Sequence, residues 1–191
     1  VHGILVQHPV PAPIDRRAAF EAIPPEKDVD GVTSSTIGRV ILGMPAFASC
    51  TPKGIMQLLD EYNVELDGSH AVVIGRSPIL GRPMASMLIN RHATVTLCHS
   101  RTRSLPSLVR NADVLIAAVG KPRFVKGGWI KVGATVIDAG YNPGNIGDVD
   151  FEGAIEPCSL ITPVPGGVGP MTIATLIAQT AEAAAQQLGL D

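Results

Sequence analysis

Short, almost continuous apolar segments recur through the second part of the chain and alternate with helix-like segments. The apolar segments lie at residues 72–74, 94–97, 114–119 and 135–137, with a shorter one at 160–161. Runs of this kind are typical of parallel strands that are buried on both faces. Between successive runs, residues 84–91 and 105–111 are interpreted as helices. The alternation predicts βαβ units and an α/β fold with a doubly wound parallel sheet.

The first part of the chain has a different pattern. Apolar residues 3–6 predict a buried strand, and residues 15–23 predict a helix that is ended by two prolines. Thr51 followed by Pro52 predicts a second helix, with Thr51 as its N-cap. The last helix is expected over residues 172–188, where alanine is abundant.

Composition narrows the class of protein. The 191 residues are 46% hydrophobic and 17% charged, which is typical of a globular chain with a large core. A net charge of −2 and 4% aromatic residues give no support for a nucleic-acid partner. The three cysteines lack metal-ligand spacing, and neither a membrane span nor a signal peptide is recognised. We therefore expect a cytoplasmic protein with no membrane partner and no metal.

The most informative turn follows the apolar run at 72–74. Gly75, Ser77 and Gly81 have the spacing GxSxxxG, with serine where a dinucleotide-binding turn usually has its second glycine. Glycines let the backbone approach a pyrophosphate, and the following helix presents free N–H groups to it. A tight strand-to-helix turn without a ligand remains the alternative.

The residues after the second strand indicate which nucleotide is bound. NAD sites usually place an acidic residue here, but residues 98–103 contain none. Arg76, Ser100 and one nearby arginine are suited to a 2′-phosphate, which favours NADP; an exposed basic turn with no role is the alternative.

Residues 162–172 contain three prolines and three glycines, which make the backbone rigid in places and sterically open in others. They form either a loop that lies flat against a planar ligand or an irregular connection, without a ligand, between a strand and the last helix.

Eight strings occur in order: VQHPVP, PPEKDVDG, CTPKGI, AVVIGRSPILGRPMA, TVTLCHSRT, ADVLIAAVGKP, GDVDF and ITPVPGGVGPMT. With them, nearly the whole chain resembles the methylenetetrahydrofolate dehydrogenase/cyclohydrolase family of one-carbon folate metabolism. The resemblance implies a Rossmann-like NADP-binding domain over 67–170 and the remnant of an α/β catalytic domain over 1–50. A connecting helix over 51–66 joins them, and a C-terminal helix over 171–191 packs back on the catalytic domain.

The resemblance also implies site residues. For the cofactor these are Gly75, Arg76, Ser77, Ser100, Tyr141 and Thr172; for the folate substrate they are Val6, Gln7, His8, Asp30, Pro165, Gly166 and Gly169. Gln7 and Asp30 would belong to the catalytic centre. The Asp30 carboxylate is suited to accept hydrogen bonds from the N–H donors of a pterin, and Gln7 would lie beside the reactive centre. Simpler alternatives are that Asp28 or Asp30 caps a turn and that Gln7 satisfies a strand end. His8 and Tyr141 depart from the family's usual leucine and small aliphatic residue.

The implied activity is NADP-dependent oxidation of 5,10-methylenetetrahydrofolate to the methenyl form, followed by hydrolysis to 10-formyltetrahydrofolate. The family uses a Tyr-x-x-x-Lys lysine for the hydrolysis, and this chain contains no such string. The family's N-terminal third, which carries it, is therefore expected to be missing. An inert NADP-binding module and a dehydrogenase-only relative are the alternatives. A homodimer through the NADP-binding domain is also implied.

Overall fold

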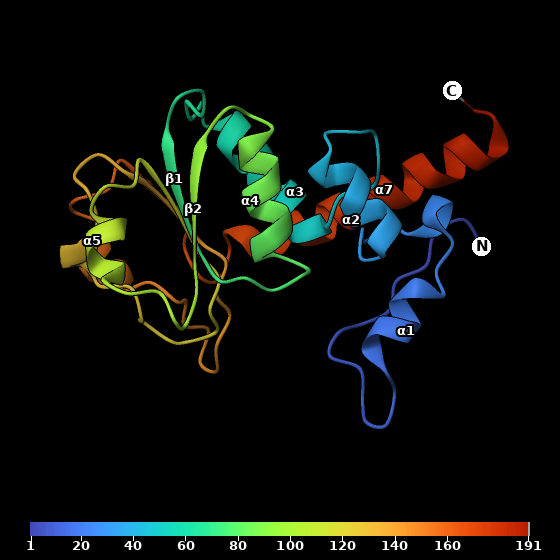
Figure 1. The fold of residues 1–191 in the computed structure, drawn as a ribbon, viewed down its shortest axis with the longest axis horizontal. Helices are drawn as coiled ribbons and strands as arrows, with labels where there is room; N and C mark the ends of the chain where they lie inside the picture. The colour runs from blue at the N-terminus through green and yellow to red at the C-terminus, as the bar shows by residue number, and fades with distance from the viewer. Residues whose placement is uncertain (191) are drawn as a thin grey trace.

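The computed structural model describes residues 1–190, and its centre is a parallel sheet (Figure 1). The sheet has the strand order β2-β1-β3-β4-β5. Its strands are β1 His70–Ile74, β2 Thr94–Cys98, β3 Val114–Ala117, β4 Thr135–Asp138 and β5 Leu160–Ile161. All four neighbouring pairs are parallel. The predicted doubly wound α/β fold is confirmed.

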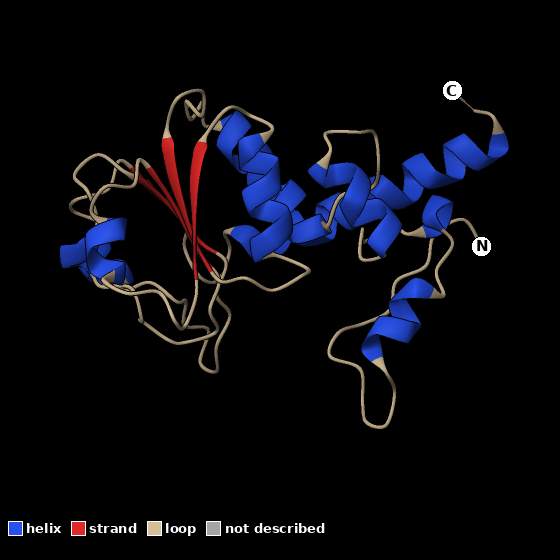
Figure 2. Ribbon diagram, viewed as in Figure 1, coloured by secondary structure: helices blue, strands red, loops and turns tan. Residues whose placement is uncertain are grey.

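Helices cover both faces of the sheet (Figure 2). On one face lie α3 (Cys50–Glu61) and α4 (Gly81–Ile89); on the other lie α5 (Leu105–Val109), η2 (Gly127–Trp129) and α6 (Phe151–Ala154). Neighbouring strand residues alternate between the two cores: Val73 packs on the α3–α4 side, whereas Val72 packs on the α5 side. Burial on both faces explains why β1, β3 and β4 are almost continuously apolar, whereas the edge strand β2 is partly exposed.

A long helix connects the sheet to the first part of the chain. Helix α7 (Val168–Leu188) packs along α3 and extends away from the sheet, so that its far end lies beside the N-terminus (Figure 1). The Gln187 amide donates to the carbonyl oxygen of His2 at 2.8 Å. At the other end, Gly54 of α3 leaves room for Met171, whose backbone would be 3.1 Å from an added Cβ.

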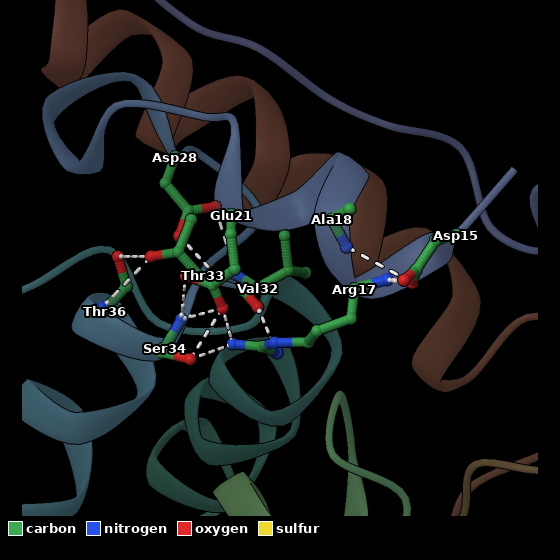
Figure 3. Close-up of polar contacts among 9 residues, drawn as sticks. All are labelled: Asp15, Arg17, Ala18, Glu21, Asp28, Val32, Thr33, Ser34 and Thr36. Carbon is green, nitrogen blue, oxygen red and sulfur yellow. Dashed lines mark hydrogen bonds and ion pairs between the residues drawn. The ribbon is translucent and has the colours of Figure 1, made fainter.

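The first part of the chain contains α1 (Arg16–Glu21), η1 (Pro25–Lys27) and α2 (Ser34–Ile41). Asp15 caps α1 by accepting from the Arg17 amide at 2.8 Å. Ser34, at the start of α2, contacts both Arg17 and Glu21 of α1, and Figure 3 shows these side chains converging. The two short helices are therefore joined by polar side chains at their surfaces.

The strand predicted over residues 3–6 is wrong, because this segment is irregular. Its backbone is tied by a hydrogen bond from the Ile4 amide to the Lys27 carbonyl at 2.8 Å, and residues 1–190 provide no strand beside it. Ile4 and Val6 instead pack against the buried cluster of Phe20, Ile23 and Val32. Their apolar character reflects this packing rather than a sheet.

Two helix starts also differ from expectation. Helix α3 begins at Cys50 with Ser49 in the cap position, so Thr51 is not the N-cap. The Thr51 hydroxyl instead accepts from the Thr172 hydroxyl at 3.0 Å. Helix α7 begins at Val168 rather than 172, because Pro170 falls in its first turn, where its missing N–H costs no helical hydrogen bond. Among the helices of residues 1–190, none combines the length and apolarity needed to cross a bilayer.

Candidate functional site

The order of the strands defines a switch point in the sheet. From the adjacent strands β1 and β3, the chain continues to β2 on one side and to β4 on the other. The register aligns the last residues of four strands in one row: Cys98, Ile74, Ala117 and Asp138. In open α/β sheets, ligands bind beyond the carboxyl ends of the strands at such a switch point.

The turn after β1 is closely packed against its neighbours. A Cβ on Gly75 would lie 2.1 Å from the Ala118 carbonyl oxygen, and a Cβ on Gly81 would lie 1.9 Å from the Gly75 carbonyl oxygen. Gly75 also has a φ of +124°, which other residues rarely adopt. Ser77 closes the turn, since its Oγ accepts from the Leu80 amide at 3.1 Å. Both glycines are therefore required by backbone proximity.

The start of α4 is suited to an anion. No side chain caps its amino end, and Arg76 and Ser77 are exposed beside it. In the first turn the Arg82 amide already donates to the Ser77 carbonyl oxygen at 3.1 Å and Pro83 has no N–H, so the Gly81 N–H and the positive end of the helix dipole are what favour negative charge here. The residues present therefore fit the pyrophosphate of a dinucleotide.

Ser100 lies on the neighbouring turn, after β2. The two turns are directly connected, because the Gly75 amide donates to the Cys98 carbonyl at 2.9 Å. Thr102 holds the second turn by accepting from the His99 amide at 2.8 Å, which leaves Ser100 and Arg101 exposed. The structure thus brings the predicted residues at 75–77 and 100 together at one edge of the sheet.

The other two predicted cofactor residues are farther along the chain. Tyr141 follows β4 at the same edge, is 76% exposed and donates to Asn145 Oδ1 at 3.2 Å. Thr172 lies in α7, and its hydroxyl is engaged by Thr51 and by the Val168 carbonyl at 3.3 Å. Thr172 therefore contributes to the contact between α3 and α7.

Three of the predicted folate-site residues lie in the irregular segment before α1. Val6 is half-buried against the cluster that contains Phe20, whereas Gln7 and His8 are exposed. The Gln7 amide donates to the carbonyl oxygen of His8 at 3.2 Å. This is a local contact, so within residues 1–190 the Gln7 side chain is not held by another segment.

Asp28 and Asp30 have different environments. Asp28 is completely buried, and its carboxylate accepts from the Val32 amide at 3.0 Å and the Thr33 amide at 2.9 Å (Figure 3). Asp28 is therefore the residue that caps the turn. Asp30 is only half-buried and lies near Cys50 at the start of α3.

The environment of Asp30 disfavours its charge. Burial raises the pKa of the Asp30 carboxyl above its usual 3.8, although hydrogen bonding with the Cys50 thiol and backbone opposes the rise. Burial, assisted by the Asp30 charge, raises the pKa of the Cys50 thiol to about 12. The thiol is therefore protonated at neutral pH.

The remaining predicted residues belong to the loop between β5 and α7. Pro165 and Gly166 are exposed, and Gly169 is exposed in the first turn of α7. The loop borders a cavity of about 340 Å³ whose other walls come from α3, β4 and β5. The predicted substrate residues are thus divided among the first segment, the start of α3 and this loop.

Two buried carboxylates lie at the carboxyl edge: Asp138 is visible in the sequence as the end of a strand that lines the expected cofactor crevice, whereas Asp148 is missed by sequence reasoning. Asp138 ends β4, and Asp148 lies in the loop that follows. Burial raises the pKa of Asp138, against hydrogen bonds from the amides of Val149, Asp148 and Gly140. Asp148 lies in a loop and meets residues 119–121 only in the folded chain, so no local signal marks it. Over residues 1–190 no cluster of His, Cys, Asp and Glu side chains is arranged to hold a metal ion.

Comparison with known proteins identifies the family. Residues 49–188 match the model of the tetrahydrofolate dehydrogenase/cyclohydrolase NAD(P)-binding domain, and residues 1–30 match that of the catalytic domain of the same enzymes. Bifunctional protein FolD 1 of Streptomyces avermitilis is 62% identical over 190 residues, covering 100% of this chain and 66% of that protein. The FolD protein of Cellvibrio japonicus is 59% identical over 188 residues, covering 98% of this chain and 67% of that one.

Solved structures of enzymes from the same family are also similar to this chain. The bifunctional FolD enzyme of Campylobacter jejuni is 46% identical and superposes with a TM-score of 0.95 over 97% of this chain and 68% of that one. The dehydrogenase–cyclohydrolase of Trypanosoma brucei, solved with NADP and an inhibitor, is 39% identical with a TM-score of 0.94, covering 98% and 68%. This chain thus spans about two thirds of the length of these relatives.

The family comparison accounts for the site described above. The matched NAD(P)-binding region contains the Gly75 turn, the row of strand ends and the loop before α7. The resemblance predicted from the eight ordered strings is confirmed. The chain therefore belongs to the tetrahydrofolate dehydrogenase/cyclohydrolase family.

Proposed function

We propose that this chain provides the NADP site and part of the folate site of an enzyme with two successive activities. The first is oxidation of 5,10-methylenetetrahydrofolate to 5,10-methenyltetrahydrofolate, and the second is hydrolysis of that product to 10-formyltetrahydrofolate. The observation that carries the proposal is the Gly75–Gly81 turn at the switch point of a family NAD(P)-binding domain. The Trypanosoma brucei enzyme was solved in complex with NADP, which supports this choice of cofactor.

The residues around the turn have separable roles in this proposal. The close backbone at Gly75 and the amino end of α4 hold the pyrophosphate, with Ser77 fixing the turn. Arg76 and Ser100 hold the 2′-phosphate through charge-assisted hydrogen bonds. NADP, when bound, supplies the hydride acceptor. Tyr141 and Thr172 remain proposed contacts farther along the same cofactor.

The folate is held by the other side of the site. Asp30 accepts hydrogen bonds from the N–H donors of the pterin, and these donors favour the ionised carboxylate against its burial. Val6, Gln7 and His8 approach the substrate from the first segment, and Pro165, Gly166 and Gly169 approach it from the loop before α7. Their position in three segments is suited to enclosing a long substrate.

Oxidation requires orientation more than acid–base catalysis. The folate nitrogen next to the methylene carbon donates its electron pair as the hydride leaves, which gives the methenyl cation. In the second step, water adds to this carbon, the carbon–nitrogen bond opens and one proton is released. That step needs a proton-transfer group. Lys53 is the basic residue at the start of α3, but it lacks the tyrosine of a Tyr-x-x-x-Lys string and its ammonium donates to Gln179 Oε1 at 3.0 Å, so we do not assign this role to it.

Two wider features belong to the same proposal. We include a homodimer through the NADP-binding region, which analytical ultracentrifugation at several protein concentrations would test. A cytoplasmic location is also proposed, in keeping with three cysteines that are all free in the structure.

Substitution of Arg76 tests the cofactor assignment. Arg76→Ala should raise the Kd for NADP at least tenfold, equivalent to about 1.4 kcal/mol, and leave the Kd for NAD unchanged. Arg110→Ala, an exposed arginine at the end of α5, is the matched control. An unchanged preference between NADP and NAD in Arg76→Ala would show that the 2′-phosphate is held elsewhere.

The two activities should be measured separately, as NADPH formation and as loss of methenyltetrahydrofolate. Sequencing of the gene upstream of Val1 would accompany the assays. A longer product, where the gene encodes one, should be assayed beside the 191-residue chain. NADPH formation without hydrolysis in the longest product would replace the proposal with a dehydrogenase alone, and no NADP binding would reject it entirely.

A further inference from the structure

One buried carboxylate accepts hydrogen bonds from the backbone amides of the loop after β3. Asp148 has no exposed surface. Its Oδ2 accepts from the Val119 amide at 2.5 Å and the Gly120 amide at 2.8 Å, and its Oδ1 accepts from the Lys121 amide at 2.8 Å. Three consecutive N–H groups therefore point at one carboxylate, an arrangement that fixes the direction of the loop.

This loop continues directly from the backbone that supports the dinucleotide turn. Ala118, the residue before it, donates to the Ile74 carbonyl at 2.8 Å. The Ala118 carbonyl oxygen is also the atom that a Cβ on Gly75 would meet. The loop at 119–121 is thus placed at the switch point between β1 and β3, where a dinucleotide passes from one half of its site to the other.

Asp148 is itself held from the β4 side. Asp138, the last residue of β4, accepts from the Asp148 amide at 2.9 Å. A Cβ on Gly140 would lie 2.3 Å from the Asp148 Cγ, and a Cβ on Gly147 would lie 1.9 Å from Asp138 Oδ2. These glycines allow the two carboxylates to approach the backbone. Asn142 completes the set by donating to Asp148 Oδ1 at 3.0 Å.

We propose that Asp148 is a positioning residue for the cofactor site, which joins the loops after β3 and β4 so that they receive the nicotinamide half of NADP. Being buried, it acts through the loop at 119–121 and not by contact with the cofactor. The inference rests on the proposed NADP site. It assigns Asp148 to the β3–β4 half, whereas Arg76 and Ser100 belong to the adenosine half at β1 and β2.

This division gives a test that distinguishes a positioning role of Asp148 from a general loss of folding, because misfolding would weaken the binding of both ligands. NADPH occupies both halves of the site, whereas 2′,5′-ADP occupies only the adenosine half. Asp148→Asn should raise the Kd for NADPH at least tenfold and leave the Kd for 2′,5′-ADP within twofold of wild type. Asp150→Asn is the matched control: the Asp150 side chain comes from the same short string but makes no cap hydrogen bond, so both Kd values should remain within twofold.

The possible results are distinguishable. If wild type binds both ligands and Asp148→Asn binds NADPH normally, or loses both ligands equally, the inference is overturned and the proposed function stands. If wild type binds neither ligand, the proposed function fails and the inference fails with it.

A milder variant covers the case in which Asp148→Asn does not fold. Asn142→Ala removes one of the four contacts to the Asp148 carboxylate and leaves the three amides in place. Hydrogen exchange of the Val119, Gly120 and Lys121 amides should become at least tenfold faster, while exchange of the Gly75 amide is unchanged. The Kd for NADPH should rise about threefold. Unchanged exchange at all three amides, with unchanged NADPH binding, would overturn the inference.

Discussion

The carboxyl edge of the sheet and the first segment hold their predicted site residues by different means. At the sheet edge, the backbone approaches itself so closely that Gly75 and Gly81 accept no side chain, and a buried carboxylate at Asp148 fixes the next loop. In the first segment, Gln7 is exposed and bonds only to its neighbour. Asp30 lies beside Cys50 at the start of α3, which is distant from it in the sequence.

The difference separates two kinds of site. The turn from Gly75 to Gly81 occupies a short stretch of chain, so its spacing is visible in the sequence, although the Ala118 backbone that it meets is distant. The folate side is built from side chains that long-range contacts bring together. Substitutions in one region should therefore act through local backbone fit, and in the other through contacts between distant segments.

The largest effect on the free energy of unfolding is expected when alanine replaces Gly81, and a second helical glycine, Gly38, provides the contrast. Gly81→Ala places a Cβ 1.9 Å from a carbonyl oxygen and should destabilise the fold by at least about 3 kcal/mol. In Gly38→Ala of α2 the Cβ meets nothing within 4 Å, so we expect stabilisation by about 0.5–1 kcal/mol. Urea unfolding measures both, and equal effects would contradict the contrast.

The second-largest loss of stability is expected at Gln179 of α7. Gln179 is completely buried, and its amide donates to the Val29 and Ala48 carbonyl oxygens at 2.7 and 2.9 Å. Gln179→Ala leaves these acceptors unpaired and should cost about 2–4 kcal/mol.

Gln187 is the matched control for Gln179. It also donates to two carbonyl oxygens, those of His2 and Glu26, but it is exposed. Water replaces its partners in Gln187→Ala, so the loss should be less than about 1 kcal/mol. Thermal and urea unfolding of both variants measure the difference. A loss at residue 187 as large as that at 179 would show that burial does not set the cost.

Two aspartates should give opposite pH dependences. Burial raises the pKa of Asp30, so its contribution to stability is present below pH 3.8 and is lost as the pH rises through the folded value. Asp30→Asn should therefore gain stability relative to wild type over that rise. Hydrogen bonding by Lys131 lowers the pKa of Asp113, so its contribution is present above pH 3.8 and is lost as the pH falls through the folded value.

The Asp113 effect should be smaller. Asp113 and Lys131 are both about half exposed, and solvent screens their 2.5 Å ion pair to less than about 1 kcal/mol. Asp113→Asn should lose stability relative to wild type at neutral pH, and the loss should disappear in acid. Urea unfolding from about pH 3 to pH 7 measures both variants. Changes of the same sign in the two variants would contradict the assigned causes.

The sequence predicts the sheet well because its central strands β1, β3 and β4 are buried on both faces, so each appears in the sequence as a local apolar run. It fails at residues 3–6, where Ile4 and Val6 pack against the cluster that contains Phe20 and the run does not pair in a sheet. Apolarity indicates burial but does not distinguish burial by a strand from burial by an irregular segment.

The site shows the same limit. The Gly75 turn is visible as spacing, whereas the role of Asp148 depends on an approach that becomes possible only when residues 119–121 and 148 meet in space. The start of α3 was misassigned because Ser49 takes the cap position while its hydroxyl donates to the Gly31 carbonyl at 2.9 Å. A hydroxyl engaged by another segment gives no local capping signal.

The smallest effect is expected from alkylation of single thiols, whose rates compare the solvent access of the two regions. Cys50, in the folate-side region, is buried and has its pKa raised to about 12. Cys158, near the sheet, is only partly buried, although burial raises its pKa as well. Because the thiolate is the reacting species and must be accessible, iodoacetamide should modify Cys158 first. Peptide mass spectrometry over time measures the order, and unfolding in urea should make the two rates similar. Faster modification of Cys50 in the folded chain would mean that the start of α3 opens to solvent, and that the contacts of Gln179 with Val29, Ala48 and Cys50 are too weak to keep it closed.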